Sequence, residues 1–347
     1  MTHIYVKLIG AGTPLRLTDS TKSDFSPVWS PDGRYIAFAR ESDQGSEVLS
    51  VPSLGGQERR LGHSEASRAE WNNSFGFAAR VLAWSPDGKL IAVVDKGRIC
   101  FVSVANLAKR EFTSPSAGHY GYADPAFSPD GRTLAFVRSS AGDVANIYLQ
   151  PVAGGQPRRL TSEGSSGLAW TGDGRAIIYS VAEATSSSAS GYALWLFPSA
   201  ANAKPVRVLG SGSDQMHANF SPSGGLVAYS SNESGRFQVY VQTFPLSDRK
   251  WPVSTNGGYE PRWRGDGREI YYLAENRELM AVPVNVGPSF GAPKPLFQMR
   301  VPRGVEAFRT HYVPSCDGRR FLVNTQATDP APLAITVVLD WTAGLKK

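Results

Sequence analysis

The sequence has 347 residues, a formal net charge of +6 at pH 7 and 41% hydrophobic residues. Its 35 glycines and 24 prolines are typical of a turn-rich all-β protein, and its basic residues form no run of five or more, so the charge does not indicate nucleic-acid binding. The longest apolar run, near LAITVVLDW, is too short to span a bilayer, and two cysteines suggest neither a zinc site nor a disulfide framework.

The first predicted elements are two strands in IYVKLIGAGTPLRLT, residues 4–18, which match the second half of a repeating unit. At the other end, a final unit has two strands and a third in ITVVLDW, but no fourth. We therefore expect the N-terminal strand PLRLT to complete the last unit.

The next stretch, SPVWSPDGRYIAFAR at residues 26–40, contains a turn that recurs in seven copies. Proline presets φ, aspartate bonds its own backbone, and glycine accepts positive φ, so each copy predicts two strands joined by a tight turn. We interpret the turn carboxylates as residues that stabilise the turn rather than as metal ligands, because Ser223 replaces aspartate in the fifth copy. The six turn aspartates are Asp32, Asp87, Asp130, Asp173, Asp266 and Asp317.

Each turn is followed by a third apolar run, such as RICFVSV or NIYLQPV, and a short fourth run such as RRL. Four strands per unit of 40 to 50 residues predict an all-β propeller of seven four-stranded antiparallel blades, with a truncated eight-bladed parent as the alternative. We expect a single domain over residues 1–347. Aromatic residues three positions before the turn are expected to pack between blades: Trp29, Trp84, Phe127, Trp170, Phe220 and Trp263.

Two insertions lengthen the repeat, and both are predicted on the same face of the blades. The first, GHSEASRAEWNNSFGFAARV at residues 62–81, carries Trp71, Phe75 and Phe77. These rings either contact a partner or fold back on the blades. The second is the serine-rich segment EATSSSASG at residues 183–191.

One repeat position combines histidines and carboxylates on the insertion-bearing face. It lies six residues before the turn aspartate, on the innermost strand, and four of its members are candidate ligand-binding residues: Asp124, His217, Glu260 and His311. They could orient a polar ligand or bind a divalent cation, or they could form a solvated polar rim. The solvated rim is the favoured interpretation over a metal, so no cofactor is expected.

A ring of cations directly follows the turns on the opposite face. Solvated turn flanks explain it, although an acidic protein or an anionic membrane surface could use it. Its members are Arg34, Lys89, Arg132, Arg175, Arg268 and Arg319.

The pattern W-S-P-D-G-[RK]-x-[IL]-A-[FV] resembles the WD40-like repeat of TolB and its relatives over nearly the whole chain. The two terminal stretches look more narrowly like the C-terminal propeller of bacterial serine/threonine kinases and winged-helix regulators. The resemblance implies a protein-binding or ligand-sensing module. No H-R-D, D-F-G or G-x-G-x-x-G motif occurs, and no alternation of strands and helices like that of an α/β-hydrolase follows the repeats.

We therefore expect a non-catalytic propeller that binds a protein or small polar ligand on its insertion-bearing face, as a sensor or scaffold of a bacterial signalling protein, and not an enzyme. The alternative is the propeller part of a hydrolase, either a gating domain of prolyl-oligopeptidase type or a metal-dependent lactonase-like enzyme. We expect a soluble monomer without a transmembrane segment, cytoplasmic as written, or extracytoplasmic if it belongs to a longer membrane-anchored protein.

Overall fold

A computed structural model describes residues 3–8, 15–67, 80–114, 119–140, 143–162, 164–183, 191–199, 203–209, 212–247, 249–285, 287, 289–299, 311–325 and 334–339. The chain forms two compact units: unit 1 comprises Met1–Arg159 and Thr310–Lys347, and unit 2 comprises Leu160–Arg309. Every regular element in the described ranges is a β-strand. None of those residues lies in a helix that could span a membrane.

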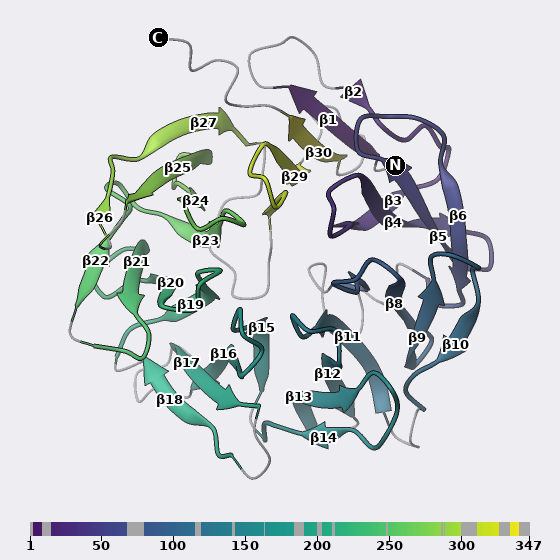
Figure 1. Cartoon of the computed structure of the whole chain (residues 1–347), viewed down its shortest axis with the longest axis horizontal. Coiled ribbons are helices and arrows are strands. Elements are labelled where there is room, and N and C mark those ends of the chain that lie inside the picture. The colour runs from purple at the N-terminus through teal and green to yellow at the C-terminus, as the bar shows by residue number, and fades with distance from the viewer. Residues whose placement is uncertain are drawn as a thin grey trace. The chain divides into compact units, whose positions relative to one another are not determined.

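Three sheets of unit 1 are four-stranded antiparallel blades in sequence order. Blade 1 holds β3 (Asp24–Trp29), β4 (Tyr35–Ser42), β5 (Gly45–Pro52) and β6 (Arg59–Ser64). Blade 2 holds β7 (Leu82–Trp84), β8 (Leu90–Asp95), β9 (Arg98–Ser103) and β10 (Lys109–Glu111). Blade 3 holds β11 (His119–Phe127), β12 (Thr133–Ser140), β13 (Asp143–Pro151) and β14 (Arg158–Arg159). Figure 1 shows these sheets one after another, coloured from purple to teal.

The fourth sheet of unit 1, blade 7, joins the two ends of the sequence. Its order is β2 (Leu15–Arg16), β1 (Ile4–Leu8), β30 (Ala334–Leu339), β29 (Arg320–Thr325) and β28 (Tyr312–Pro314). β1 pairs parallel with β30, from Ile4 opposite Ile335 to Leu8 opposite Leu339. The N-terminal segment therefore completes the last unit, but the prediction that PLRLT is the completing strand is wrong, because β1 and not β2 pairs with β30. It adds two strands rather than one, because β1 occupies the edge of β30 and β2 then pairs with the outer edge of β1.

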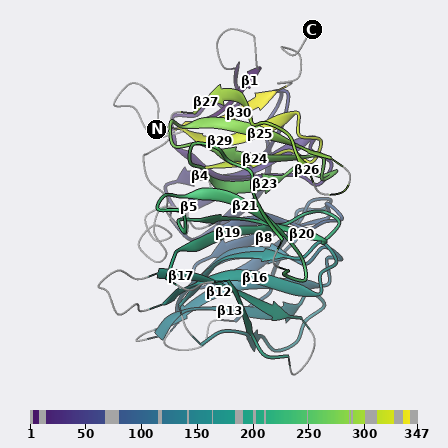
Figure 2. The same cartoon turned by 90° about the vertical axis from the view of Figure 1, so that its left-hand side faces the viewer.

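Unit 2 contains blades 4 to 6. Blade 4 holds β15 (Ser165–Trp170), β16 (Ala176–Glu183), β17 (Gly191–Pro198) and β18 (Val206–Leu209). Blade 5 holds β19 (Gln215–Phe220), β20 (Leu226–Ser231), β21 (Gln238–Thr243) and β22 (Lys250–Pro252). Blade 6 holds β23 (Tyr259–Trp263), β24 (Glu269–Leu273) and β25 (Glu278–Asn285), which pairs with both β26 (Ser289–Phe290) and β27 (Lys294–Gln298). Figure 2 shows strands of these sheets running side by side.

Seven blades make the fold a β-propeller, as predicted, and their pairings are antiparallel except for the parallel pair β1 and β30 in blade 7. Two of the blades hold five strands instead of four: blade 7 gains β1 and β2, and in blade 6 the long strand β25 pairs with two short strands. The single domain expected for residues 1–347 stays a prediction.

The recurring turn is built as its residue types predict. In blade 1, Asp32 Oδ1 accepts hydrogen bonds from Ser30 Oγ (2.6 Å) and from the Arg34 amide (3.0 Å), and Ser30 Oγ accepts the Tyr35 amide (2.9 Å). The hydrogen bond from Ser30 holds the pKa of Asp32 below its usual value. Gly33 closes the turn at φ 67°. The turn carboxylates are thus used within their own turns.

The core consists of buried strand residues, with the repeat aromatics packed at its border. Trp84 and Phe127 pack against a cluster that draws on blades 1 to 3 and includes the fully buried Phe101. Trp29 borders a cluster that joins blade 1 to Ile4 and Leu322 of blade 7. In unit 2, Phe220 and Trp263 border or join the clusters of blades 4 to 6.

Candidate functional site

The repeat position that carries the candidate ligands is a β-bulge on the innermost strand. Each bulge shifts the pairing of the first two strands of its blade, at Phe25/Val28, Ala123/Ala126, Ser166/Ala169, Met216/Asn219 and Tyr259/Arg262. The bulge residue adopts a left-handed backbone in five blades: Ser26 (φ 49°), Asp124 (49°), Gly167 (62°), His217 (58°) and Glu260 (56°). A bulge changes the direction of a side chain, so the sequence spacing located a special backbone site.

The four candidate residues are divided between the two units. Asp124 and His311 belong to unit 1, and His217 and Glu260 belong to unit 2. His217, Glu260 and His311 are buried, whereas Asp124 is partly buried. Within the described part of the chain, no group of three or more histidine, cysteine, aspartate or glutamate side chains is arranged to hold a metal ion.

In unit 2 the structure brings His217 and Glu260 together around Ser230 of β20. Ser230 Oγ accepts the Glu260 amide at 3.1 Å and lies 3.4 Å from His217 Nδ1. Which of the two groups donates in this contact depends on the tautomer of the imidazole, because the serine hydroxyl can both donate and accept. Both Ser230 and Glu260 are fully buried.

The same two bulges are joined by a second polar link. Asn219 Nδ2 donates to the carbonyl oxygens of His217 (2.9 Å) and Pro261 (3.2 Å), while Asn219 O accepts the indole N–H of Trp263 (3.0 Å). These bonds hold the left-handed backbones of neighbouring blades in one arrangement. The backbones of His217 and Glu260 are therefore fixed relative to one another, Glu260 through its amide.

In unit 1, Asp124 is engaged with the end of the first insertion. Its Oδ1 accepts the Arg80 amide at 2.9 Å and lies 3.6 Å from Arg80 Nε, and its own amide donates to Arg80 O at 2.9 Å. In blade 1 the equivalent residue, Ser26, accepts the Val81 amide with its hydroxyl at 3.1 Å. Asp124 of blade 3 and Ser26 of blade 1 thus both hydrogen-bond to the segment that precedes β7 of blade 2.

The remaining predicted residues do not extend this site. Trp71, Phe75 and Phe77 lie outside the described residues. Four of the turn cations lie 3.8 to 3.9 Å from the aspartate of their own turn and are largely exposed, which fits solvated turn flanks; they are Arg34, Lys89, Arg175 and Arg268.

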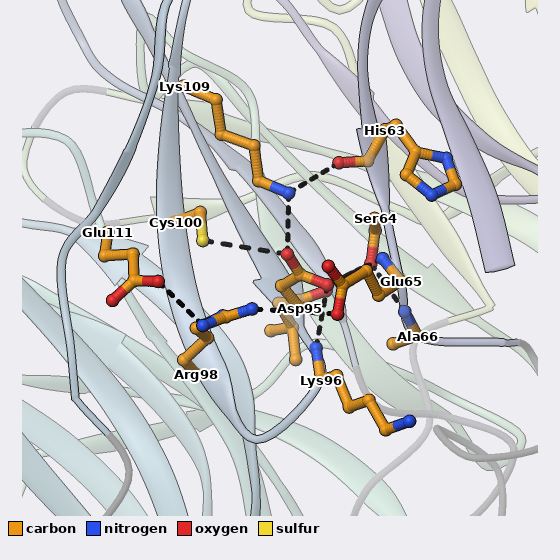
Figure 3. Close-up of polar contacts among 11 residues, drawn as sticks. His63, Ser64, Glu65, Ala66, Asp95, Lys96, Arg98, Cys100, Lys109 and Glu111 are labelled. Atoms are coloured by element: carbon orange, nitrogen blue, oxygen red, sulfur yellow. Dashed lines mark hydrogen bonds and ion pairs between the residues drawn. The ribbon is translucent and has the colours of Figure 1, made fainter. Parts of the chain in front are cut away.

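A buried carboxylate that the sequence analysis missed is Asp95, at the end of β8 (Figure 3). It is 1% exposed and accepts hydrogen bonds from Lys109 Nζ (2.6 Å), Ser64 Oγ (3.1 Å) and the amides of Glu65 (2.7 Å) and Lys96 (2.8 Å). Burial alone would raise its pKa, but the hydrogen bond from Lys109 and the backbone amides outweigh burial and lower the pKa to about 2. The signal in the sequence was an aspartate that ends an apolar strand before Lys-Gly.

The Asp95 cluster also contains Cys100 and a surface ion pair. Cys100 Sγ lies 3.8 Å from Asp95 Oδ2, and burial raises the pKa of this thiol to about 11, so it is not a nucleophile at neutral pH. Arg98 bonds Glu111 at 2.7 Å and approaches Glu65 at 3.7 Å. The cluster thus links strands of blades 1 and 2.

Some of the known proteins that are similar to this chain are named as enzymes. No known family profile matches it. A stretch of 60 residues, 17% of this chain, is 45% identical to the uncharacterized peptidase YuxL of Bacillus subtilis, and this match covers 9% of that protein. The uncharacterized protein Atu1656 of Agrobacterium fabrum is 22% identical over 202 residues, which cover 58% of this chain and 67% of that protein.

Solved structures with the same fold include two enzymes. An oligogalacturonate lyase in complex with manganese has a TM-score of 0.72 at 14% identity, covering 98% of this chain and 96% of that chain. A puromycin-hydrolyzing peptidase of Mycobacterium tuberculosis has a TM-score of 0.66 at 15% identity, covering 92% of this chain and 52% of that chain. TolB of Acinetobacter baumannii is also similar, at a TM-score of 0.47. The narrower resemblance to propellers of kinases and winged-helix regulators stays a prediction.

These similarities point to an enzyme and contradict two expectations. The expectation of a non-catalytic sensor or scaffold is wrong, and so is the expectation that the protein is not an enzyme, because a relative that is 45% identical over 60 residues is named as a peptidase. The reason for the error is physical. In a fold built from repeats, reactive groups can come from separate blades or from another domain, so a missing consecutive motif does not exclude catalysis.

Proposed function

We propose that this chain is the propeller part of a hydrolase of the peptidase kind. The observation that carries the proposal is the 45% identity to a protein named as a peptidase, over 60 residues. The propeller-sized match to the puromycin-hydrolyzing peptidase supports it, because 92% of this chain corresponds to 52% of that longer chain. The remainder of such a chain is large enough to hold a catalytic domain.

In this proposal the chain supplies substrate access and orientation, while the nucleophile comes from a domain outside these residues. The sequence has one G-x-S-x-G match, GPSFG at residues 287–291, but its Ser289 lies in the short strand β26, which pairs antiparallel with β25. It is therefore not the strained strand-to-helix turn that presents a catalytic serine in α/β-hydrolases. The seven blades would then act as a rigid scaffold whose loops determine which substrates reach the reacting group.

The test compares the 347-residue chain with the natural polypeptide purified from its source by an antibody against these residues. Both are treated with a fluorophosphonate probe for active serine and assayed with puromycin and with chromogenic aminoacyl anilides. We expect labelling and hydrolysis by the natural polypeptide and neither by the 347-residue chain. The absence of labelling and hydrolysis from both samples would contradict the proposal.

A second candidate function is acid–base catalysis within this chain, and the geometry around Ser230 favours it. His217 and Glu260 meet on adjacent blades, held by Ser230 and Asn219. The likeness to a lyase covers nearly all of both chains, so a propeller of this size can be an enzyme alone. His217 Nε2 would exchange a proton with the substrate, while buried Glu260 would act through its neighbours because it has no exposed surface.

This candidate is tested by assaying the chain with oligogalacturonate as the probe, with His217→Gln and Glu260→Gln as variants. We expect each variant to lower kcat by roughly 100-fold or more, as the loss of a positioned acid or base does. His63→Gln is the matched control, because the described contact of His63 uses its backbone carbonyl. Turnover of the probe that is equal in the parent chain and both variants would eliminate this role.

A further inference from the structure

The first insertion leaves blade 1 after β6 and enters blade 2 before β7, and both of its ends lie in unit 1. The end that follows blade 1, called here the entering end, is Ser64–Ala66. The end that precedes blade 2, called here the leaving end, is Arg80–Val81. Ser64, Ala66 and Val81 are buried, although they belong to a connection rather than to a strand centre. Buried backbone N–H and C=O groups need hydrogen-bond partners, so the side chains that bond these groups are the ones that hold the connection in place.

The entering end is clamped between the hairpins of two blades. From blade 1, Ser46 Oγ donates to Ala66 O at 3.0 Å. The backbones approach so closely there that a Cβ on Gly45 would lie 2.3 Å from Ser64 O. From blade 2, Asp95 accepts both the Ser64 hydroxyl and the Glu65 amide (Figure 3).

The acceptor capacity of Asp95 is fully used by these bonds. Oδ1 accepts three donors, the Ser64 hydroxyl and the Glu65 and Lys96 amides, and Oδ2 accepts Lys109 Nζ with Cys100 Sγ 3.8 Å away, against about four lone-pair sites on a carboxylate. Lys109 balances the charge and donates in addition to His63 O at 2.8 Å. Asp95 therefore has no remaining capacity to bind a metal or a substrate.

The leaving end is held in a similar way by Asp124 of blade 3. Its side chain accepts the Arg80 amide while its backbone amide donates to Arg80 O, so the two residues form a reciprocal pair. The left-handed backbone of Asp124, at φ 49°, directs its groups toward Arg80, and aspartate and asparagine tolerate this conformation better than most residues.

We propose that Asp95 and Asp124 are paired positioning residues that fix the two ends of the first insertion, and that neither is a ligand or a catalytic acid. The described ends of the insertion, Ser64–Ala66 and Arg80–Val81, are then rigid, as the ends of loops held by a scaffold are. This role is independent of the proposed hydrolase function, and it gives Asp124 a different role from the ligand-binding one expected at the rim.

The test is hydrogen exchange of the full 347-residue chain, read by mass spectrometry on peptides that cover residues 62–67 and 80–82. The variants are Asp95→Ala and Asp124→Ala. We expect exchange at residues 65–66 to rise roughly 10- to 100-fold in the first, and exchange at residue 80 to rise by a similar factor in the second, because each loses a charge-assisted hydrogen bond. Peptides from unit 2 should be unchanged.

Two further variants separate positioning from general destabilisation. Asp124→Asn keeps the acceptor oxygen and the tolerance of a left-handed backbone, so its exchange should match the parent chain. Asp87→Ala, the matched control in blade 2, removes a carboxylate bonded only within its own turn and should leave both ends protected. If Asp95→Ala does not fold, Asp95→Asn replaces it.

The proposal is overturned if exchange at the two ends stays at the level of the parent chain. It is also overturned if exchange rises equally throughout unit 1, because the carboxylates would then stabilise the sheets as a whole. Faster exchange at residue 80 in Asp124→Asn than in the parent chain would likewise contradict the positioning role. Since no substrate enters this experiment, failure of the hydrolase proposal leaves its result unaffected.

Discussion

The substitution Asp95→Asn should destabilise the protein at neutral pH and lose its effect in acid. Asp95 is almost fully buried and its pKa is about 2, against an ordinary value of 3.8. A group whose pKa is depressed by folding stabilises the folded state above its unfolded pKa, and this contribution is lost as the pH falls through the folded pKa. The stabilisation should therefore be complete above about pH 5 and disappear between about pH 4 and pH 2.

The magnitude follows from the difference between the two pKa values. A difference of somewhat less than two units corresponds to about 2 kcal/mol of unfolding free energy. Asparagine keeps one acceptor oxygen but removes the charge opposite Lys109, which is bonded at 2.6 Å. We thus expect Asp95→Asn to lower the unfolding free energy by about 2 kcal/mol at pH 7 and by much less at pH 2.5.

Urea unfolding followed by tryptophan fluorescence, at several values between pH 2.5 and pH 7, measures this difference. Asp87→Asn is the control, because Asp87 lies on a turn of the same blade, is more than half exposed and bonds only within its turn. Its effect should be small at every pH. A loss of stability for Asp95→Asn that is equal at pH 7 and pH 2.5, or absent at pH 7, would refute the reasoning.

Three other measurements test the structure. Phe101→Ala should lower the unfolding free energy in urea by about 3–5 kcal/mol, because the ring is fully buried and stacks on Phe112 at 4.3 Å; a loss below about 1 kcal/mol would contradict its place in the core. Asp24→Ala should cost about 3 kcal/mol, since it removes a fully buried carboxylate bonded to Arg40 at 2.6 Å, whereas Asp43→Ala on the exposed surface should have a much smaller effect; equal losses would show that burial does not govern these pairs. Thermal melting with and without a chelator should give the same midpoint, and a lower midpoint with chelator would show a bound metal ion.

Much of the blade architecture could be predicted because it is encoded locally and repeated. The Ser-Pro-Asp-Gly turn requires only neighbouring residues, so the hydrogen bonds of Asp32 in blade 1 follow from residue types. The pairing of the N-terminal strands with the last blade could also be expected, because incomplete units at the two ends were visible. The parallel pairing of β1 with β30 could not, since strand direction depends on the path of the chain between them.

The candidate site was predicted less well, and its residues show why. The spacing placed Asp124 and Glu260 at one repeat position, but it did not reveal the left-handed bulge or that Asp124 bonds Arg80. Asp95 gave no repeating signal, because its partners Ser64 and Lys109 are distant in sequence. The prediction of a non-catalytic module was wrong for a related reason: reactive groups can come from separate blades or from another domain, so short sequence motifs do not decide whether a protein is an enzyme.

The sequence by itself determined the turns, the strands and the number of blades, because each depends on contacts between residues a few positions apart. Only the tertiary structure decided which polar groups meet: His217 and Glu260 at Ser230, and the two ends of the insertion at Asp95 and Asp124. The physical reason is that a buried polar group must find a partner wherever the backbone brings one within hydrogen-bonding distance, and that distance is set by the packing of blades rather than by sequence separation.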